Sequence, residues 1–228
     1  MHDDRTGAIA AHFIGAVAAS RRGSVPFRHW LIEDVLPREA CAAIAALPFA
    51  PPPHGMETRG RRETLNSTRI FFSAGNRARF PVCDAVAAAL QDPATTERLR
   101  LLCGVPLAGS FLRIEYCQDV DGFWLEPHTD IGAKLFTMLV YLSTGPGAEA
   151  WGTDLLDGPE PERLVATVPC RFNAGLIFVP GSDTWHGFRP RPIDGVRKSL
   201  IVNYVVADWR SRHELAYSDR PVGKPAPI

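Results

Sequence analysis

Two histidines and an aspartate in the second half of the chain have the types and spacing of metal ligands. His128 and Asp130 are two positions apart, and His186 follows in a later segment, 184–188, that also reads as a strand. Because alternate side chains of an extended strand point to the same side, we expect His128 and Asp130 to reach a single ion. Two imidazoles and one carboxylate hold one face of a ferrous ion and leave the other open for chemistry. The spacing therefore predicts an iron site that joins two strands.

A candidate anion anchor follows the second histidine. Arg197 offers a planar fork of donors suited to a carboxylate, and Ser199 lies two residues on, which places it on the same side of a strand. These residues also have ordinary interpretations: Arg197 could pair with Asp194 at the surface, and His128 could stand beside a turn. The joint spacing of all the motifs favours the metal and anchor hypothesis.

Length and charge point to one domain that handles a small molecule. The chain has 228 residues, enough for a single domain over 1–228 with a sizeable core. Lys plus Arg equal Asp plus Glu at 25 each, so no long-range field favours nucleic acid or an anionic membrane surface. We therefore expect a small-molecule substrate, no nucleic-acid partner and no membrane partner. The sequence carries no signal for an oligomeric state.

The cysteines and the N-terminal apolar run favour a cytoplasmic protein. The five cysteines are odd in number, scattered and without CxxC spacing, which favours reduced thiols over a disulfide or zinc framework. The apolar run at 8–19 is preceded by acidic residues and interrupted by His12, so an amphipathic helix is a better interpretation than a signal peptide. No other stretch approaches the ~20 apolar residues that span a bilayer.

The residue composition and pattern of the sequence change after Gly109. Residues 1–109 read mainly helical, with helices expected at about 5–20, 37–47, 79–91 and 94–103 and a proline-rich loop at 48–60 that could border a pocket. The following short runs are rich in β-branched and aromatic residues and are bounded by Gly, Pro and Asp. They are 110–117, 124–130, 134–143, 151–156, 163–169, 175–180, 184–189 and 198–207.

Eight short strands favour a double-sheet jelly roll. We therefore expect an α+β fold, mainly β, in which a double-stranded β-helix (jelly-roll, cupin-like) core spans 110–207. The helical region 1–109 would pack on this core, and residues 208–228, with several prolines, would form a loosely attached tail.

The motifs also resemble, in order, the 2-oxoglutarate and iron(II)-dependent dioxygenase superfamily, most closely its prolyl-hydroxylase-like branch. The resemblance covers roughly residues 110–207. It is carried by the HxD motif at 128–130, the strand after it at 134–143, the stretch 151–155 with Thr153 in place of the second glycine of Gly-Gly-x-Leu, the distal histidine at 185–187, and Arg-x-Ser at 197–199.

The resemblance implies cofactors and roles. His128, Asp130 and His186 would hold Fe(II) and form the catalytic centre, and O2 and 2-oxoglutarate would be cosubstrates, giving succinate and CO2. Arg197 and Ser199 would bind the distal carboxylate of 2-oxoglutarate. Tyr141 and Tyr116 would lie near that cosubstrate, although aromatic residues in strands are usually packing residues. Asp130 argues against a halogenase, since related halogenases lack the carboxylate.

Hydroxylation of an unactivated C–H bond of a small metabolite, such as an amino acid derivative, is the preferred function. Arg69 and Arg113 are candidates for contacting an anionic substrate and Trp124 for walling the pocket, each with a structural role as the ordinary interpretation. Hydroxylation of a protein or peptide side chain, as by a prolyl hydroxylase, is the alternative within the same chemistry. A non-catalytic sensor of metal and 2-oxoglutarate, or a zinc hydrolase on the same three ligands, stays open.

Overall fold

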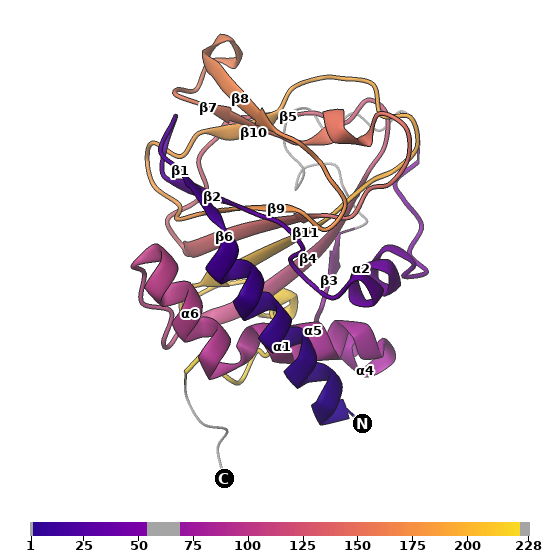
Figure 1. Cartoon of the computed structure of the whole chain (residues 1–228), viewed down its shortest axis with the longest axis vertical. Coiled ribbons are helices and arrows are strands. Elements are labelled where there is room, and N and C mark those ends of the chain that lie inside the picture. Colours follow the sequence, from indigo (N-terminus) through magenta and orange to yellow (C-terminus); the bar gives the residue numbers. More distant parts are fainter. Residues whose placement is uncertain (1, 54–68, 224–228) are drawn as a thin grey trace.

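Two antiparallel sheets face each other, and helices cover the outer side of the larger one (Figure 1). The computed structural model describes residues 2–53 and 69–223. The larger sheet has seven strands in the order β1 (Arg21–Gly23), β2 (His29–Ile32), β9 (Gly175–Phe178), β6 (Lys134–Tyr141), β11 (Arg197–Val205), β4 (Phe111–Asp119) and β3 (Ile70–Phe71). The smaller sheet has four, in the order β5 (Leu125–His128), β10 (His186–Phe188), β7 (Thr153–Leu156) and β8 (Leu164–Val168).

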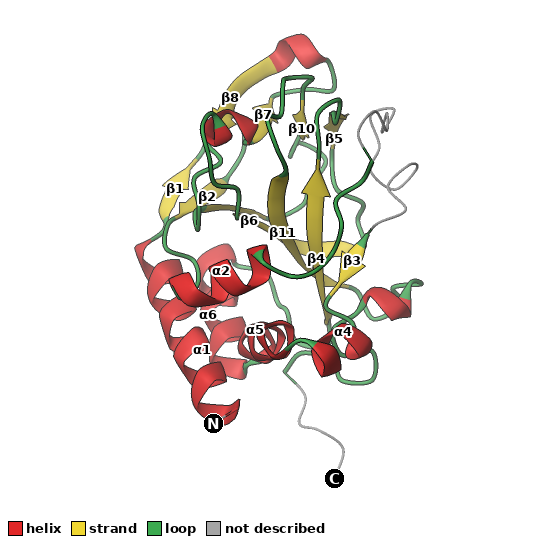
Figure 2. Cartoon of the chain, turned by 90° about the vertical axis from the view of Figure 1, so that its right-hand side faces the viewer, coloured by secondary structure: helices red, strands yellow, loops and turns green. Residues whose placement is uncertain are grey.

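The helices come from the first half of the chain and lie together against one face of the larger sheet (Figure 2). They are α1 (His2–Ala19), α2 (Arg38–Ala45), α4 (Ala74–Arg79), α5 (Pro81–Gln91) and α6 (Pro93–Cys103). Local signals set their ends: the Asp92 side chain accepts hydrogen bonds from the first turn of α6, and Gly104, with φ of 76°, ends it. Among the described helices, none combines the length and apolar character needed to cross a membrane.

Alternation along the central strands creates two different faces. On β4, Leu112, Ile114 and Tyr116 belong to the core shared with the helices, whereas Arg113 and Glu115 point between the two sheets and line a cavity there. Because side chains of a strand alternate in direction, one strand supplies both an apolar contact for the helices and polar groups for the cavity. Strands β6 and β11 behave alike.

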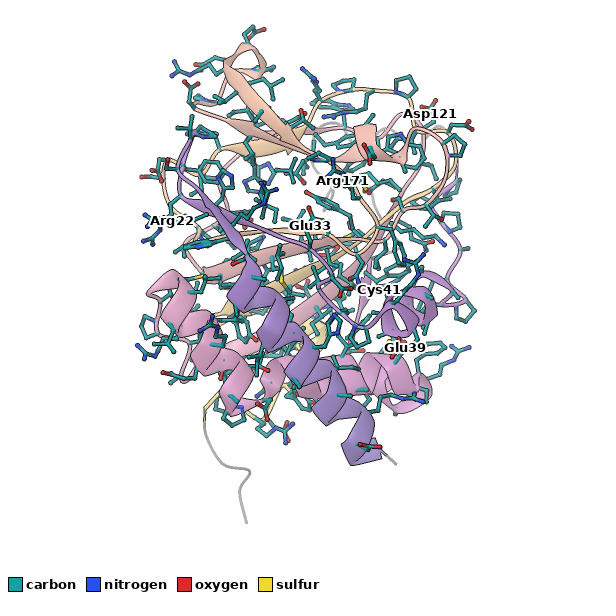
Figure 3. All side chains as sticks on the ribbon, in the orientation of Figure 1. Arg22, Glu33, Glu39, Cys41, Asp121 and Arg171 are labelled. Atoms are coloured by element: carbon teal, nitrogen blue, oxygen red, sulfur yellow. The ribbon has the colours of Figure 1, made fainter. Side chains whose placement is uncertain are left out.

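A second apolar cluster fills the rest of the space between the sheets. It includes Leu139 and Tyr141 from β6, Leu176 and Phe178 from β9, and Phe188 from β10. Charged side chains lie around the outside instead, as for Glu33 and Arg171, which form an exposed ion pair at 3.8 Å (Figure 3). The five cysteines are buried and free.

All eight expected strands are present, which confirms the predicted jelly roll, but three details differ. Strand β5 ends at His128 rather than Asp130, and β7 begins only after a short 3₁₀ turn at Ala148–Trp151. The first half of the chain also contributes β1, β2 and β3, which extend the larger sheet. These strands have two to four residues, too short to show a period of their own.

The expected loose tail is packed as far as the structure describes it. Tyr217 and Val222 are buried, and the backbone of Val222 exchanges hydrogen bonds with Gly109 and Ser110. The proline content misled the prediction, because buried side chains on both sides of Pro221 attach the segment. Residues 224–228, and residues 54–60 of the expected proline-rich loop, lie outside the described part of the chain.

Candidate active site

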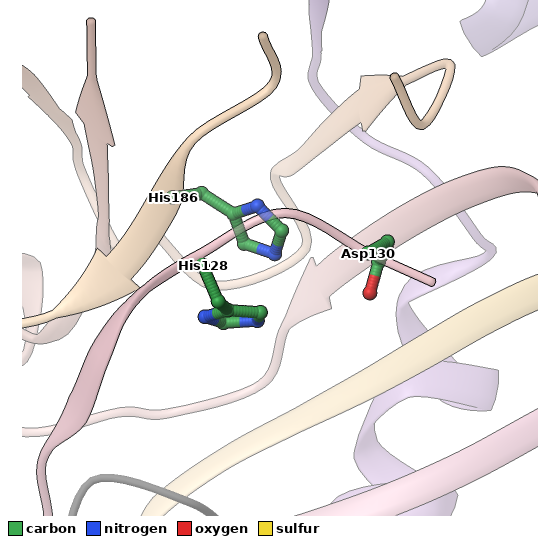
Figure 4. A group of neighbouring side chains, drawn as sticks. All are labelled: His128, Asp130 and His186. Carbon is green, nitrogen blue, oxygen red and sulfur yellow. The ribbon is translucent and has the colours of Figure 1, made fainter. Parts of the chain in front are cut away.

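The structure brings His128, Asp130 and His186 together at one end of the smaller sheet (Figure 4). His186 on β10 is the direct antiparallel partner of His128 on β5, and their ring centroids are 4.3 Å apart. One ligand atom from each of the three residues lies within 4.8 Å of the others. The two histidines therefore meet through strand pairing, while Asp130 arrives from the loop beyond β5.

Both histidines are held in the tautomer that a metal requires. Nδ1 of His128 lies 2.8 Å from the carbonyl oxygen of Glu126, and Nδ1 of His186 lies 2.9 Å from that of Thr184. A carbonyl oxygen only accepts, so each Nδ1 carries the hydrogen and each Nε2 keeps a lone pair. Burial, and then the neighbouring His128, lowers the pKa of His186 to about 4, which keeps its ring neutral at neutral pH.

Two residues that the sequence analysis did not single out orient Asp130. Nζ of Lys134 lies 2.5 Å from Oδ1, and the hydroxyl of Thr137 donates to Oδ2 at 2.6 Å. Burial alone would raise the pKa of the Asp130 carboxyl, but Lys134, His186 and these hydrogen bonds outweigh it and hold the pKa well below its usual range. Asp130 is therefore a fixed anionic donor beside two imidazoles, a set that suits Fe(II) with an open face.

The three ligands open onto a cavity of about 530 Å³ between the two sheets. Its floor is the polar face of the larger sheet, and its roof is the smaller sheet. Beyond the ligands, the walls carry charges of both signs and several aromatic rings, and they include Arg69, Arg113, Glu115, Phe123, Lys134, Thr137, Phe188, Arg197, Ser199, Trp209 and Glu214.

Arg197 and Ser199 both line this cavity, as the anchor hypothesis requires. Nε of Arg197 donates to the carbonyl oxygen of Trp151 at 2.7 Å, and Nη1 donates to Asp119 at 2.5 Å. The Ser199 hydroxyl is buried, and the described residues offer it no hydrogen-bond partner. A buried hydroxyl without a partner is costly, so its position beside Arg197 suits a ligand carboxylate.

The two tyrosines differ. Tyr141 lies opposite Ser199 in the sheet and donates its hydroxyl hydrogen to Thr153 at 2.8 Å. Tyr116 instead points away from the cavity into the core under the helices, where its hydroxyl lies 3.5 Å from the Ala45 carbonyl oxygen. The structure does not support Tyr116 as a cosubstrate contact, because even-numbered side chains of β4 face the helices.

Among the substrate candidates, the structure brings Arg69 and Arg113 to the cavity but not Trp124. Arg69 forms a two-pronged ion pair with Glu115 at 2.9 and 3.0 Å. Arg113 donates to Glu115, Glu214 and Asn203. In the described part of the chain, the neighbours of Trp124, Phe123 and Leu125, line the cavity in its place.

Several site residues were missed, although part of the signal was present in the sequence. Thr137 shares the strand face of Tyr141, and Glu115 shares that of Arg113, so alternation alone could have found them. Asp119 also lies on the face of β4 that Arg113 and Glu115 share. Glu214 and Trp209 come from the segment after the last strand, and their arrival depends on tertiary packing that no local pattern reveals.

Comparison with known proteins places this geometry in a familiar fold. No protein-family model and no curated protein sequence matches the chain. A solved prolyl-4-hydroxylase from Pseudomonas putida is 15% identical with a TM-score of 0.54, covering 87% of this chain and 94% of that one. A prolyl hydroxylase from Trichoplax adhaerens, solved with a peptide fragment of the hypoxia inducible factor oxygen degradation domain, is 12% identical with a TM-score of 0.58, covering 92% and 94%.

A third similar structure is the viral collagen prolyl hydroxylase of Paramecium Bursaria Chlorella virus-1, solved as a 2-oxoglutarate complex. It is 16% identical with a TM-score of 0.52, covering 78% of this chain and 96% of that one. Each match spans nearly the whole of the known protein. The chain therefore has the prolyl hydroxylase fold, the double-stranded β-helix that its strand pattern predicts.

Proposed function

We propose that the protein is an iron(II)- and 2-oxoglutarate-dependent dioxygenase that hydroxylates an unactivated C–H bond. One observation carries the proposal: a two-histidine, one-carboxylate cluster with both Nε2 lone pairs available opens onto the same cavity as Arg197 and the unpartnered Ser199 hydroxyl. Among the described residues, side chains suited to a metal ion and side chains suited to a carboxylate thus line one cavity. The fold that the chain shares with prolyl hydroxylases supports this pairing.

Iron and 2-oxoglutarate, when bound, would supply the oxidation; O2, 2-oxoglutarate and substrate would give succinate, CO2 and hydroxylated product. The protein supplies binding, orientation and exclusion of water. Lys134 and Thr137 fix the Asp130 carboxylate, and the Glu126 and Thr184 carbonyls fix the imidazoles. Arg197 and Ser199 would orient the far carboxylate of the cosubstrate.

The size and lining of the cavity beside the metal ligands support the hypothesis that the substrate is a small polar molecule. Its volume of about 530 Å³ falls within the range of small-molecule sites. Arg69 and Glu214 face each other there at 3.8 Å, so groups of both signs are within reach of a substrate with charged ends. An amino acid derivative has that character, and we infer that it is the preferred class.

A second hollow favours an alternative, a protein or peptide side chain. It measures about 630 Å³ and shares Ile131, Trp209 and Ser211 with the first cavity. The two hollows therefore adjoin beside the metal ligands, and a chain of several residues could lie across both. The known protein from Trichoplax adhaerens is seen with a bound peptide fragment, which makes this alternative worth testing directly.

The experiment is an anaerobic titration of the protein with ferrous ion and then 2-oxoglutarate, followed by exposure to O2 and measurement of succinate. We expect metal-dependent binding of 2-oxoglutarate and formation of succinate, stimulated by one of two substrate pools, metabolites or peptides. Binding without succinate under either pool would identify a sensor instead. Failure to bind 2-oxoglutarate at all would overturn the proposal, and a His186→Ala variant provides the negative control.

A further inference from the structure

The Arg197 guanidinium already has an anionic partner within the protein. Asp119 on β4 is the direct antiparallel partner of Arg197 on β11, and its carboxylate accepts a hydrogen bond from Nη1 at 2.5 Å. Both side chains are almost completely buried, with 4% and 1% of their surfaces exposed. Their charges therefore face each other with little screening by water, and Asp119 compensates part of the charge of the guanidinium.

The Arg197 guanidinium nevertheless has N–H groups that these hydrogen bonds do not use. A guanidinium has five N–H groups, and the hydrogen bonds to Trp151 and Asp119 use one at Nε and one at Nη1. Nη2 is not used in either bond, and the Ser199 hydroxyl nearby is buried without a partner among the described residues. Phe188 lies against the guanidinium, with its ring centroid 4.7 Å from Cζ, and limits its movement. A ligand carboxylate can therefore bind without displacing Asp119.

Binding of that carboxylate would place two negative charges around one positive charge in a buried site. The repulsion between the two carboxylates opposes binding, whereas in the empty site Asp119 compensates a cation that burial would otherwise leave uncompensated. The same residue therefore stabilises the empty protein and weakens the hold on its ligand.

We propose that Asp119 sets the affinity of the Arg197 anchor for the distal carboxylate of 2-oxoglutarate, holding it below what the guanidinium alone would give. The inference rests on the proposed function, because it takes 2-oxoglutarate as the ligand of this anchor. Asp119 is then a residue that tunes cosubstrate affinity through Arg197 and touches no reacting atom.

The decisive variant is Asp119→Asn, which keeps the size and an acceptor oxygen and removes the charge. We expect its dissociation constant for 2-oxoglutarate, measured by anaerobic calorimetry with ferrous ion, to fall on the order of tenfold, because a like charge close to the ligand carboxylate is removed. The melting temperature of the ligand-free variant should fall, and saturating 2-oxoglutarate should raise it by more than it raises that of the wild type.

Asp154→Asn is a matched control. Asp154 is equally buried and accepts a hydrogen bond from Thr167, but its arginine partner, Arg191, does not line the cavity, whereas Arg197 does. Its variant should lose stability without any change in 2-oxoglutarate affinity. If Asp119→Asn is folded and binds 2-oxoglutarate equally well or more weakly than the wild type, the inference is overturned.

A measurement on the wild type covers the case in which Asp119→Asn does not fold. The affinity for 2-oxoglutarate is compared with that for 2-oxopentanoate, which lacks the distal carboxylate. Because Asp119 already offsets the guanidinium, the distal carboxylate should improve affinity by less than about tenfold, the lower end for a hydrogen bond to a charged group. A much larger ratio would contradict the role of Asp119. Failure of the wild type to bind 2-oxoglutarate would instead overturn the proposed function itself.

Discussion

At the scale of single residues, the orientation of Asp130 matters as much as its identity. An aspartate beyond the end of a strand has freedom to rotate, and here Lys134 and Thr137 remove it by holding one oxygen each. Because Thr137 is neutral, its hydrogen bond can be tested without changing the charge of the site.

Thr137→Val should weaken binding of ferrous ion by about 10–100-fold, the usual cost of removing a partner of a metal ligand, while the fold persists. Competition with a metal-binding dye under anaerobic conditions would measure this. Thr167→Val is the matched control, since Thr167 makes an equivalent 2.7 Å hydrogen bond to Asp154 away from the ligands. Equal metal affinity in the two variants would show that Thr137 does not position Asp130.

Ser199 offers a second residue-scale prediction, because its hydroxyl has no partner among the described residues. Ser199→Ala should leave the melting temperature of the ligand-free protein unchanged or raised, since no hydrogen bond within the protein is lost. It should raise the KM for 2-oxoglutarate by about 2–10-fold, corresponding to one hydrogen bond to the ligand. Ser110→Ala should do the reverse, losing stability but not cosubstrate affinity, because Ser110 bonds the Leu107 carbonyl oxygen at 2.6 Å.

At the scale of elements, the register between β5 and β10 decides whether the histidines meet. Gly187 follows His186, and a Cβ placed there would lie 2.9 Å from the Leu125 carbonyl oxygen and 3.2 Å from that of Glu126. Both contacts are with the backbone of β5, which can give way only if the strands separate.

Gly187→Ala should therefore displace His186 from His128, lowering the melting temperature and the affinity for ferrous ion together. Calorimetry and metal titration on the same preparation would show both changes. Gly15→Ala is the contrasting variant, because Gly15 lies within α1 and no atom would come within 4 Å of its new Cβ. That substitution should raise stability by about 0.5–1 kcal/mol through helix propensity alone. Wild-type metal binding by Gly187→Ala would argue against the importance of the register.

The elements also show why some of the site followed from sequence and some did not. His128 and His186 lie on strands that the apolar pattern predicts, Asp130 follows the first of them by two residues, and Arg197 begins β11 one residue before the predicted strand, so their meeting needs only the predicted jelly roll. Tyr116 was misplaced, because every residue of β4 is buried and burial alone marks neither face. The charged residues Arg113, Glu115 and Asp119 share one parity along β4, and this could have assigned Tyr116 to the other face.

The pairing of Asp119 with Arg197, in contrast, could not be predicted from a local sequence pattern. It depends on the register between β4 and β11, two strands far apart in the sequence, and a shift of one residue would have pointed these side chains to opposite faces. Local pattern fixes which strands exist. The register follows from packing of the whole sheet.

At the scale of the whole molecule, a largely buried ionic cluster joins the residue before β3 and the segment after β11 to β4 of the larger sheet. Arg113 on β4 lies at its centre, bonded to Glu115 on the same strand and to Glu214 at 2.6 Å from the segment after β11. Arg69, the residue before β3, joins the cluster through Glu115. The cluster forms one wall of the cavity, so the same charges organise the fold and border the substrate space.

Arg113→Ala should lower the free energy of unfolding by about 3–5 kcal/mol, because it leaves two buried carboxylates with reduced compensation. Urea denaturation followed by circular dichroism would measure the loss. Arg100→Ala, which removes a pair with Glu97 on the exposed surface of α6, should leave the urea midpoint unchanged. A similar midpoint shift in both variants would mean that burial of the cluster contributes nothing beyond an ordinary surface pair.

The position of His128 on β5 affects the local stability of the protein in the absence of a bound metal ion. Among the residues that the structure describes, β5 is the edge of the smaller sheet and pairs with β10 alone, so few backbone hydrogen bonds keep it in place. A metal ion that binds His128, Asp130 and His186 would link this edge strand to the rest of the site and stabilise it in the folded position. Stripping the metal with a chelator should therefore speed amide hydrogen exchange in Leu125–His128 while the central strands of the larger sheet stay protected. When iron is scarce, we therefore expect proteolysis to begin at this edge strand.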